Sequence, residues 1–515
     1  MGNRKERSTE SALQLLTEQI HSVWLSKKHI ASVLSLDISG AFDAVNHSRL
    51  LDNLRLKTIP GWLIRWIKAF LNDRSTTMLI DGELTQPYRL RSGVPQGSPL
   101  SPILFLFYNS PLLEALDQPK QRLHPLGYAD DVNLLTYGTT TAETSQRLVK
   151  AHDICLDWAR THGMKFAEAK YTLIHFTRKH QSETSHSPVV LQSATIYPSA
   201  SVKILGVEVD NKLRWAAQID KIKQKLVTQM YALTRTTAST WGATMIKARQ
   251  LYIAIIRSAI GYASPIWFST SHRPVKKNKV VSQLATVQNK ALRIVTGAFK
   301  ATRIRQLETE AYIPPIDLWL QAKAADFQRR LERTGMAQLI RSLSAPIRRQ
   351  VLGRRWKRTS SRPAKNQTPF ETARTDALKW FEKDDFESCD GTLKTRVLKN
   401  WKTRWREKAT GLRREGDQSI TDSPAIPEDT EPTAKVLALH KNLRKAESSV
   451  LVQARTGCIG LKQFLYKRRV LGVTSPNCTY SYDIETVRYL ILYYIEYLDK
   501  IALNQFTTRQ RLVDY

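Results

Sequence analysis

The chain has 515 residues, with 79 Lys and Arg against 46 Asp and Glu, a formal net charge of +33 and a pI near 10.0. Hydrophobic residues make up 42% and charged residues 24%, which excludes a wholly disordered or fibrous chain and allows about three domains. The excess of cations favours a nucleic acid as the partner, and an anionic membrane surface is the second possibility. The polar start, the lack of a long apolar run and four scattered cysteines indicate an intracellular protein, nuclear or cytoplasmic and not secreted.

The first third of the sequence alternates helical and strand-like patterns, which predicts an α+β or α/β core. Apolar residues recur at helical spacing between Ala12 and Trp24, behind the polar start Ser8-Thr9-Glu10, and the run at 33–38 is typical of a buried strand. The segment LGYADDVNLLT is apolar on both sides of a short polar centre. We expect a hairpin there, with acidic residues at its tip.

Three more elements are expected between residue 60 and about residue 107. The spacing predicts a helix from Pro60 to about Asn72. Its largely buried residues are expected to be Trp62, Ile64, Trp66, Ile67 and Phe70. Asp81-Gly82 lies between two strand-like segments and predicts a hairpin turn. Pro99 and Pro102 suit the first turn of a following helix.

The remaining sequence is mostly helical and basic in pattern. Strand signals are few from Ala216 to Arg333. Residues 339–365 carry nine cations, Arg341 and Arg348 among them, and no acid, which favours a nucleic-acid surface over a merely solubilising one. The segment 409–433 lacks aromatic residues and is rich in Asp, Glu, Pro, Ser and Thr, so we expect a flexible linker.

Three carboxylates in two motifs are candidate metal ligands. SLDISGAFDAVNH places Asp37 at the end of the buried strand, and YADD places Asp130 and Asp131 at the hairpin tip. Like charges at short range suppress one another's ionisation, and divalent cations remove that penalty. Two Mg²⁺ ions about 3.5 to 4 Å apart can stabilise both oxygens of a phosphoryl transfer. We therefore expect Asp37 within about 10 Å of Asp130.

The segment RSGVPQGSPLSP is a Gly-, Pro- and Ser-rich turn that runs into a helix N-terminus. Its backbone can approach a flat or anionic ligand closely, and Gln96 adds an amide that donates and accepts. Taken alone, Gln96-Gly97 would be a plain turn.

The order LDISGAFDAVNH, SGVPQGSPLSP, YADD, GMKFAEAKYTLIHF and KILGVEVDNKLRW resembles the palm of a reverse transcriptase from a non-LTR, LINE-type retrotransposon. Each motif alone is weak or moderate, but five in this order are specific. The resemblance covers roughly 7–215 and extends more loosely to 333. It implies an α+β fold: a right-hand polymerase palm with an antiparallel sheet, a helical thumb and a mostly helical basic C-terminal region.

The resemblance also implies roles for individual residues. Asp37, Asp130 and Asp131 correspond to metal ligands, and Lys170 to a lysine that protonates the departing pyrophosphate. Residues corresponding to substrate-binding positions are Phe42, Gln96, Gly97 and Tyr128, and the primer grip corresponds to Leu205 and Gly206. From the residues alone, Phe42 could be a core residue and Lys170 a solvated one.

The implied activity is that of an RNA-directed DNA polymerase: a primer 3′-OH attacks the α-phosphate of a dNTP, directed by an RNA template. The implied cofactor is two Mg²⁺ ions, with Mn²⁺ as an alternative. The implied partners are an RNA template, a DNA primer and dNTP, without a membrane, and the oligomeric state is left open. The implied domains are partial fingers and palm (1–215), thumb and connection (216–335), a basic helical region (336–408), a flexible linker (409–433) and a small C-terminal region (434–515).

Two segments depart from the family pattern. The chain begins almost at KERSTESAL, so we expect an N-terminal truncation that removes basic finger residues and impairs polymerisation. At the C-terminus, Cys478 fills one position of a Cys, Cys, His, Cys knuckle, and Tyr480, Tyr489 and Tyr494 take the others. Zinc needs about four N or S donors, so no zinc is expected.

Two other interpretations stay open. The chain could be a catalytically inactive, cationic RNA/DNA-binding remnant of a retroelement. It could also be similar to a group II intron maturase, which would require a maturation domain that the sequence does not display.

Overall fold

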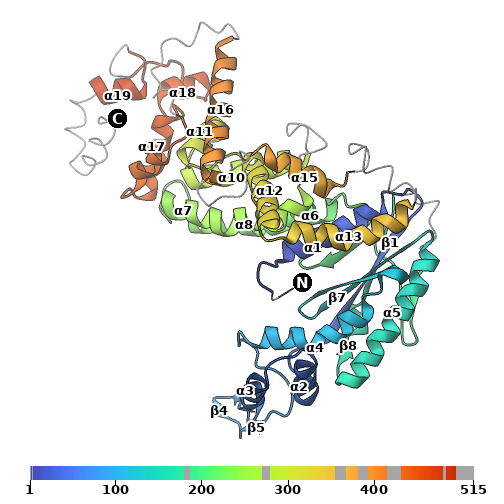
Figure 1. Ribbon diagram of the computed structural model, residues 1–515. Helices are drawn as coiled ribbons and strands as arrows, with labels where there is room; N and C mark the ends of the chain where they lie inside the picture. The colour runs from blue at the N-terminus through green and yellow to red at the C-terminus, as the bar shows by residue number, and fades with distance from the viewer. Residues whose placement is uncertain are drawn as a thin grey trace. The chain divides into compact units, whose positions relative to one another are not determined.

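The computed structural model describes residues 2, 4–178, 186–268, 279–353, 367–380, 392–414, 431–479 and 483–493. They form two compact units, each discontinuous in sequence (Figure 1). The first unit comprises residues 1–218, 265–269 and 327–375, and the second comprises 219–264, 270–326 and 376–515. The mixture of an antiparallel sheet with helices confirms the α+β class.

Every strand among the described residues belongs to the first unit. They are β1 (Ile30–Ser39), β2 (Ser75–Thr76), β3 (Leu79–Ile80), β4 (Glu83–Leu84), β5 (Tyr88–Arg89), β6 (Leu123–Tyr128), β7 (Asp131–Gly138), β8 (Lys165–Phe166), β9 (Thr172–Phe176), β10 (Val189–Val190), β11 (Thr195–Ile196), β12 (Ser201–Ile204) and β13 (Val207–Asp210). The helices of this unit are α1 (Thr9–Val23), α2 (His47–Leu56), α3 (Gly61–Leu71), α4 (Ser101–Leu116), α5 (Thr141–His162), α13 (Met336–Leu352) and the 3-10 helices η1 (Pro119–Gln121) and η2 (Glu168–Lys170).

The described residues of the second unit form helices joined by loops, with isolated β-bridges in place of strands. Its helices are α7 (Met245–Leu251), the π-helix η4 (Tyr252–Arg257), α8 (Ser258–Gly261), α10 (Lys279–Thr296), α11 (Ile304–Glu310), α16 (Thr392–Arg414), the 3-10 helix η8 (Ala434–His440), α17 (Lys445–Arg455), α18 (Lys462–Lys467) and α19 (Val487–Tyr493). Helices with residues in both units are α6 (Ala216–Thr236), α9 (Ser264–Trp267), α12 (Ile316–Arg333) and α15 (Pro369–Leu378).

A five-stranded sheet forms the centre of the first unit. Strand β1 runs antiparallel between β7 on one side and β8 with β9 on the other, and β6 pairs with the outer edge of β7. Helix α5 packs on one face, whereas α1 and α13 pack on the other (Figure 1). Because both faces are covered, β1 is buried along most of its length, as its largely apolar sequence predicts.

Several local predictions are confirmed. Helix α1 begins after Ser8, whose side chain accepts a hydrogen bond from the Ser11 backbone N–H. Asp81 and Gly82 form the two-residue turn between β3 and β4, both with positive φ, 52° and 89°. The YADD segment joins β6 and β7 as a hairpin.

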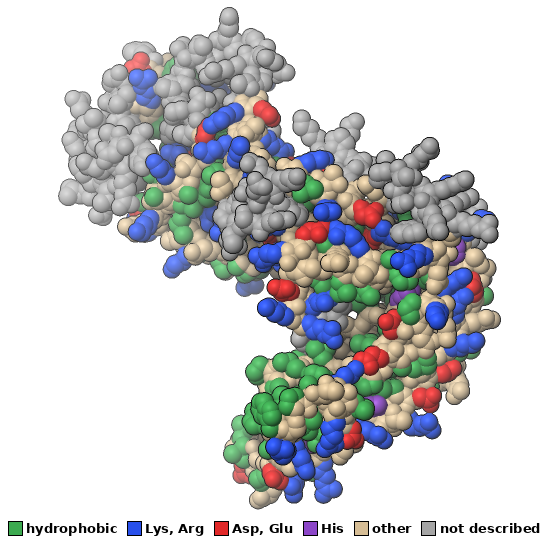
Figure 2. All heavy atoms as spheres, in the orientation of Figure 1, with side chains coloured by type: hydrophobic (Ala, Val, Ile, Leu, Met, Phe, Trp, Pro, Cys, Tyr) green, Lys and Arg blue, Asp and Glu red, His purple; other side chains and the backbone are tan. Residues whose placement is uncertain are grey.

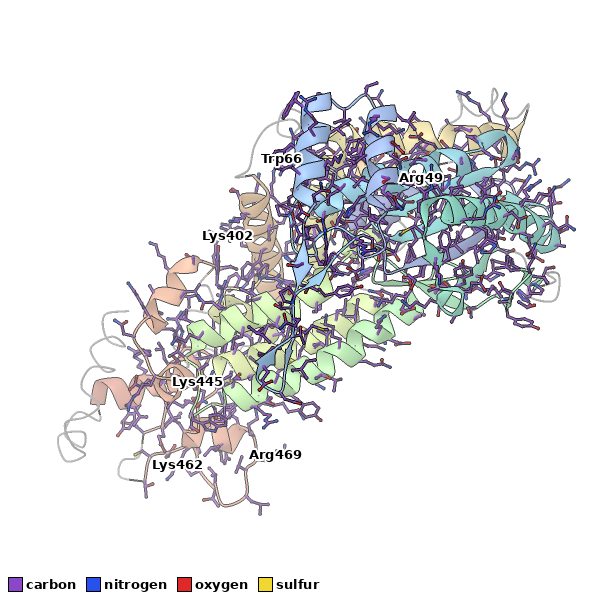
Figure 3. The ribbon with its side chains drawn as sticks, turned by 90° about the horizontal axis from the view of Figure 1, so that it is seen from below. Arg49, Trp66, Lys402, Lys445, Lys462 and Arg469 are labelled. Carbon is purple, nitrogen blue, oxygen red and sulfur yellow. The ribbon has the colours of Figure 1, made fainter. Side chains whose placement is uncertain are left out.

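The predicted burial of Trp62 and Trp66 on α3 is wrong. Their exposed fractions are 64% and 53%, and Figure 3 labels Trp66. Helix α3 packs against α2 and buries one stripe, Ile64, Ile67 and Leu71, so the rest of its circumference stays uncovered. Figure 2 shows hydrophobic side chains gathered at this end of the unit. The neighbouring hairpin strands add exposed Met78, Leu79, Ile80, Leu84 and Tyr88.

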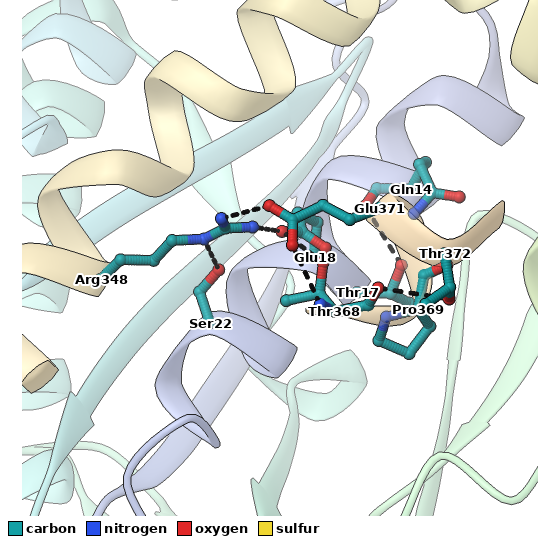
Figure 4. Close-up of polar contacts among 9 residues, drawn as sticks. All are labelled: Gln14, Thr17, Glu18, Ser22, Arg348, Thr368, Pro369, Glu371 and Thr372. Atoms are coloured by element: carbon teal, nitrogen blue, oxygen red, sulfur yellow. Dashed lines mark hydrogen bonds and ion pairs between the residues drawn. The ribbon is translucent and has the colours of Figure 1, made fainter. Parts of the chain in front are cut away.

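Arg348 of α13 is a buried structural residue (Figure 4). Its guanidinium forms an ion pair with Glu18 of α1, whose side chain is fully buried, and donates to Glu371 Oε1 at 2.6 Å and Ser22 Oγ at 3.1 Å. Thr368 Oγ1 donates to the same Glu18 oxygen at 3.1 Å. Burial raises the pKa of Glu18 to about 7. This network ties α13 to α1 within the first unit.

The prediction that 339–365 is one nucleic-acid surface is therefore wrong for Arg348, which lies in the buried network. Arg341 is partly exposed and pairs with Glu332 at 2.5 Å. The cations from Arg354 to Lys365 lie outside the described residues.

The second unit is held together around the C-terminal end of α10. The ammonium of Lys445 donates to the carbonyl oxygens of Ile294 at 2.9 Å and Val295 at 2.6 Å, and burial lowers the pKa of Lys445 to about 8. Arg455 pairs with Glu310 at 3.0 Å. Figure 3 labels Lys445. Across the described parts of both units, no helix combines the length and apolar character needed to cross a bilayer.

Part of the predicted C-terminal features lies outside the described residues. Helix α16 runs to Arg414, into the predicted linker, and residues 415–430 are not described. Of the four knuckle positions, Tyr480 and Tyr494 are likewise outside, and Tyr489 lies in α19. The absence of zinc therefore stays a prediction.

Candidate active site

The site is built first on the register between β1 and β7. Asp37 of β1 lies directly opposite Asp131 of β7. Facing residues of an antiparallel pair have Cα atoms about 4.5 to 5.5 Å apart and side chains on the same face of the sheet. Asp130 is the next residue along the chain, about 3.8 Å from Asp131 at Cα. Asp37 and Asp130 are therefore within the expected 10 Å.

The hairpin turn presents Asp130 at its tip. Tyr128 pairs with Asp131, so Ala129 and Asp130 form a two-residue turn. Ala129 has a φ of 53°, a left-handed conformation that costs a residue with a side chain about 1–3 kcal/mol. The side-chain amide of Asn109, on α4, donates to the Ala129 carbonyl at 3.5 Å. The surrounding fold thus holds the acidic turn in a strained conformation.

The three carboxylates act on one another electrostatically. The pKa of Asp131 is raised, first by its burial and then by the negative charges of Asp130 and Asp37, while the positive charge of Lys203 lowers it. Lys203 lies on β12, far from the acids in sequence, and sequence analysis did not single it out. Mutual repulsion of this kind favours a cation in the same place.

Lys170 reaches the site from the other side of β1. Strand β8 pairs with the end of β1, and the Ala167 backbone N–H donates to the Asp37 carbonyl at 2.9 Å. The following 3-10 turn, η2, carries Lys170, whose ammonium donates to Asp37 Oδ2 at 2.9 Å. This hydrogen bond, with the charge of Asp37 itself, raises the pKa of Lys170. The side chain is 68% exposed, so it can turn without disturbing the core.

The three carboxylates supply suitable donors for a divalent metal, since Mg²⁺ and Mn²⁺ prefer oxygen ligands. Their arrangement is not a finished metal cage, however. Among the residues that the structure describes, no group of three His, Cys, Asp or Glu side chains is arranged to hold a metal ion. One oxygen of Asp37 is engaged by Lys170 instead. The three carboxylates therefore fit a divalent metal ion in their oxygen donors and their negative charge.

Phe42, Gln96 and Gly97 belong to two loops that hydrogen-bond to each other. The Val94 N–H donates to the Phe42 carbonyl at 2.8 Å, and Gln96 Nε2 donates to both oxygens of Asp43 at 3.0 and 3.1 Å. Gly97 has a φ of 89° and is exposed. The loops bring the three predicted residues together at the end of β1.

Gly93 and Asp43 are functional candidates that the sequence analysis missed. Gly93 has a φ of 89°, and a Cβ there would lie 2.8 Å from the Asp43 carbonyl oxygen, so glycine is required for the two loops to meet. The Phe42 ring lies against Phe105, with centroids 5.3 Å apart, and packs on the hydrophobic core. Phe42 therefore packs on the core, whether or not it also contacts a ligand.

Leu205 and Gly206 form the turn of the β12–β13 hairpin. Ile204 pairs with Val207, and the two turn residues have φ of 48° and 83°, the combination of a type I′ turn. Lys203, whose charge acts on Asp131, precedes this turn by two residues. The hairpin therefore brings a cation toward the carboxylates, a connection that only the folded chain shows.

Residues 1–209 match the reverse transcriptase (RNA-dependent DNA polymerase) family. The antiparallel sheet and the order of motifs agree with this match, which covers residues 1–209. The family-level function is RNA-directed DNA polymerisation.

The relatives belong to non-LTR retrotransposons of the LINE type. The RNA-directed DNA polymerase from mobile element jockey of Drosophila funebris is 25% identical over 330 residues, 61% of this chain and 34% of that protein. The probable RNA-directed DNA polymerase from transposon BS of Drosophila melanogaster is 24% identical over 353 residues, which are 68% of this chain and 38% of that protein. A Pol polyprotein from type-1 retrotransposable element R2 of Popillia japonica is 36% identical over 112 residues, which are 20% of this chain and 18% of that protein. The chain spans about a third of the length of the first two relatives.

Among solved structures, apo telomerase from Candida tropicalis superposes with a TM-score of 0.32 and 11% identity, over 74% of this chain and 56% of that one. A likeness of this extent transfers no residue roles.

Proposed function

We propose that this chain is an RNA-directed DNA polymerase that adds dNTPs to a primer 3′-OH. The observation that carries the proposal is the placement of Asp37 opposite Asp131, with Asp130 beside it at the tip of a hairpin. Three carboxylates at one sheet edge, in a chain with a net charge of +33, suit a divalent cation and a polyanionic substrate together. The family of residues 1–209 supports the same reaction.

Asp37, Asp130 and Asp131 would hold the metal, two Mg²⁺ ions or Mn²⁺ in their place. When bound, such ions neutralise charge that develops on the attacking and leaving oxygens of a phosphoryl transfer. The raised pKa of Asp131 supports this assignment, because a bound cation would relieve the repulsion that raises it.

Lys170 is the proposed proton donor to the leaving pyrophosphate. Its hydrogen bond to Asp37 keeps the ammonium protonated, which is the state that a general acid requires. Its exposure allows it to turn from Asp37 toward a phosphate. Phe42 would limit space beside the sugar of the nucleotide, and Gln96 and Gly97, with Tyr128 at the hairpin base, would line the same substrate site.

The proposed partners are an RNA template, a DNA primer and dNTP. Exposed Trp62 and Trp66 support a single-stranded template, because aromatic rings stack on bases. Arg65 and Lys68 on the same helix are also exposed, and the helix carries no acid. Leu205 and Gly206 are the proposed primer grip. An intracellular location, nuclear or cytoplasmic, is supported by the free thiols of the described cysteines.

A second candidate function is nucleic-acid binding without catalysis, as in a remnant of a retroelement. The observation that favours it is the ion pair between Lys170 and Asp37, which engages one of the three carboxylates. Such a protein would bind RNA and DNA through its cations and show steep salt dependence.

Primer extension by the purified full chain on an RNA template separates the two functions. We expect Mg²⁺-dependent incorporation of dNTPs that falls by at least about a hundredfold in Asp130→Asn. Asp157→Asn is the matched control, because Asp157 is an exposed residue of α5 whose ion pair with Arg160 spans 3.4 Å. Salt-sensitive binding with no incorporation at any Mg²⁺ or Mn²⁺ concentration would refute the polymerase and support the remnant.

A further inference from the structure

A second charged feature of the first unit is a hollow of about 390 Å³. Its walls come from η1, the first residues of β6 and the middle of α5. Leu123, at the start of β6, lines it, whereas the acidic turn follows Tyr128 at the other end of the same strand. Five residues of extended chain separate the two ends by about 17 Å. The hollow is therefore distinct from the candidate active site.

The hollow is lined by four cations, Lys120, Arg122, Arg147 and Lys150, and by no carboxylate among its described lining residues. A single acid, Glu143, pairs with two of them, Arg147 at 2.6 Å and Arg122 at 3.5 Å. Lys120 and Lys150 are exposed and make no ion pair within the described chain. Cations that converge on a concave surface with one counterion concentrate a positive potential there.

The arginines are held in place by the fold. Arg147 Nη1 donates to the Tyr137 carbonyl at 2.6 Å, and the Arg122 guanidinium lies 5.7 Å from the centre of the Tyr137 ring. The Arg122 backbone has a φ of 64°, and the preceding turn is tied down by a hydrogen bond from Gln350 to the Pro119 carbonyl at 2.9 Å. A preorganised pair of arginines thus lies beside two lysines that are free to move toward a ligand.

One part of the wall is apolar. Leu123 and Ala151 are buried, and Ile154 is half-buried. These three residues line the same hollow as the exposed lysines. A fully solvated inorganic ion would leave this apolar part without a partner. A ligand that carries both phosphate and a flat or apolar group would cover the cations and the apolar wall together.

We propose that this hollow binds a nucleoside phosphate, with its phosphates on Lys120, Lys150 and the two arginines and its base or sugar against Leu123 and Ile154. Two sources share this chemistry: a free nucleotide, and one nucleotide residue of a nucleic-acid strand. Binding here needs neither the carboxylates nor a metal ion, so it stands apart from the proposed polymerase function.

The test is isothermal titration calorimetry on the full chain in EDTA, which suppresses metal-dependent binding at the carboxylates. The probes are ATP, inorganic tripolyphosphate and a six-nucleotide single strand. We expect binding that weakens at least tenfold in Lys120→Ala/Lys150→Ala. The matched control, Lys435→Ala/Lys441→Ala, removes the same charge from exposed positions of the second unit and should stay within twofold of the parent.

The relative affinities of the three probes identify the ligand, and the two double variants test the site. Tighter binding of ATP than of the strand supports the free nucleotide, and the reverse order supports the strand. Equal losses in both double variants would overturn the proposal, because only net charge would then matter. Equal affinity for ATP and tripolyphosphate would overturn the assignment of the apolar wall. Both lysines are exposed, and circular dichroism of each variant verifies that it is folded.

Discussion

Replacing Arg348 by Met tests how strongly the buried ion network stabilises the first unit. Arg348 contacts Glu18, Glu371 and Ser22, and the Glu18 side chain is fully buried. Methionine keeps much of the volume but donates no hydrogen bond, which leaves Thr368 as the side-chain donor to Glu18. One Glu18 oxygen, Oε2, already has no hydrogen-bond partner among the described residues. The variant therefore leaves a buried carboxylate without its counterion.

The expected cost is about 3–5 kcal/mol, or roughly two to four orders of magnitude in the unfolding equilibrium constant. The cost depends on pH. Burial raises the pKa of folded Glu18 from 4.5 to about 7, so its stabilising contribution is complete below pH 4.5 and is lost as the pH rises through 7. Loss of Arg348 raises that pKa further, so Arg348→Met should cost less at pH 5 than at pH 8.

Urea unfolding at pH 5 and pH 8, followed by circular dichroism, measures this cost in the transition of the first unit. Arg349→Met is the control, because Arg349 is an exposed neighbour on the same helix, and we expect a change within about 0.5 kcal/mol. The double variant Glu18→Met/Arg348→Met should recover most of the lost stability. The reasoning would be refuted if Arg348→Met and Arg349→Met lowered the free energy of unfolding equally. It would also be refuted if Arg348→Met had the same effect at pH 5 and at pH 8.

Three further predictions concern the candidate site and its surroundings. Lys170→Ala should slow single-turnover incorporation by about a hundredfold while leaving RNA affinity unchanged, and an unchanged rate would show that Lys170 is only a solvated residue. Gly93→Ala should lower the melting temperature more than Gly97→Ala, because both have a φ of 89° but only Gly93 has the Asp43 carbonyl within 2.8 Å of an added Cβ; equal melting temperatures would contradict the close approach. Trp66→Ala should weaken binding of single-stranded RNA by about 1–3 kcal/mol, and equal losses in the exposed control Tyr197→Ala would argue against stacking on α3.

The local elements of the first unit could be predicted because their signals lie within a few residues of one another. Ser8 caps the first helix, Asp81-Gly82 forms a hairpin turn, and the apolar run around Leu36 forms a strand. The YADD hairpin follows from two apolar runs and a short polar centre. Each of these depends on the conformational preference of its own residues, which tertiary contacts here reinforce.

Burial and charge partners could not be predicted in the same way. Helical spacing assigned Trp62 and Trp66 to the core, yet only one face of α3 is covered. A run of cations indicated a surface, yet Arg348 is buried against Glu18, 330 positions away in sequence. Which face of a helix is covered depends on elements that are distant along the chain, and local periodicity contains no information about them.

By itself, the sequence determined the order of motifs and indicated the candidate residues for the chemistry, the carboxylates of Asp37, Asp130 and Asp131. Only the tertiary structure decided that Asp37 faces Asp131 across two strands, that Lys170 donates to Asp37, and that Lys203 acts on the same site. The physical reason is that residue type is local, whereas strand register and electrostatic neighbours arise from contacts that close long loops and bury both faces of the sheet.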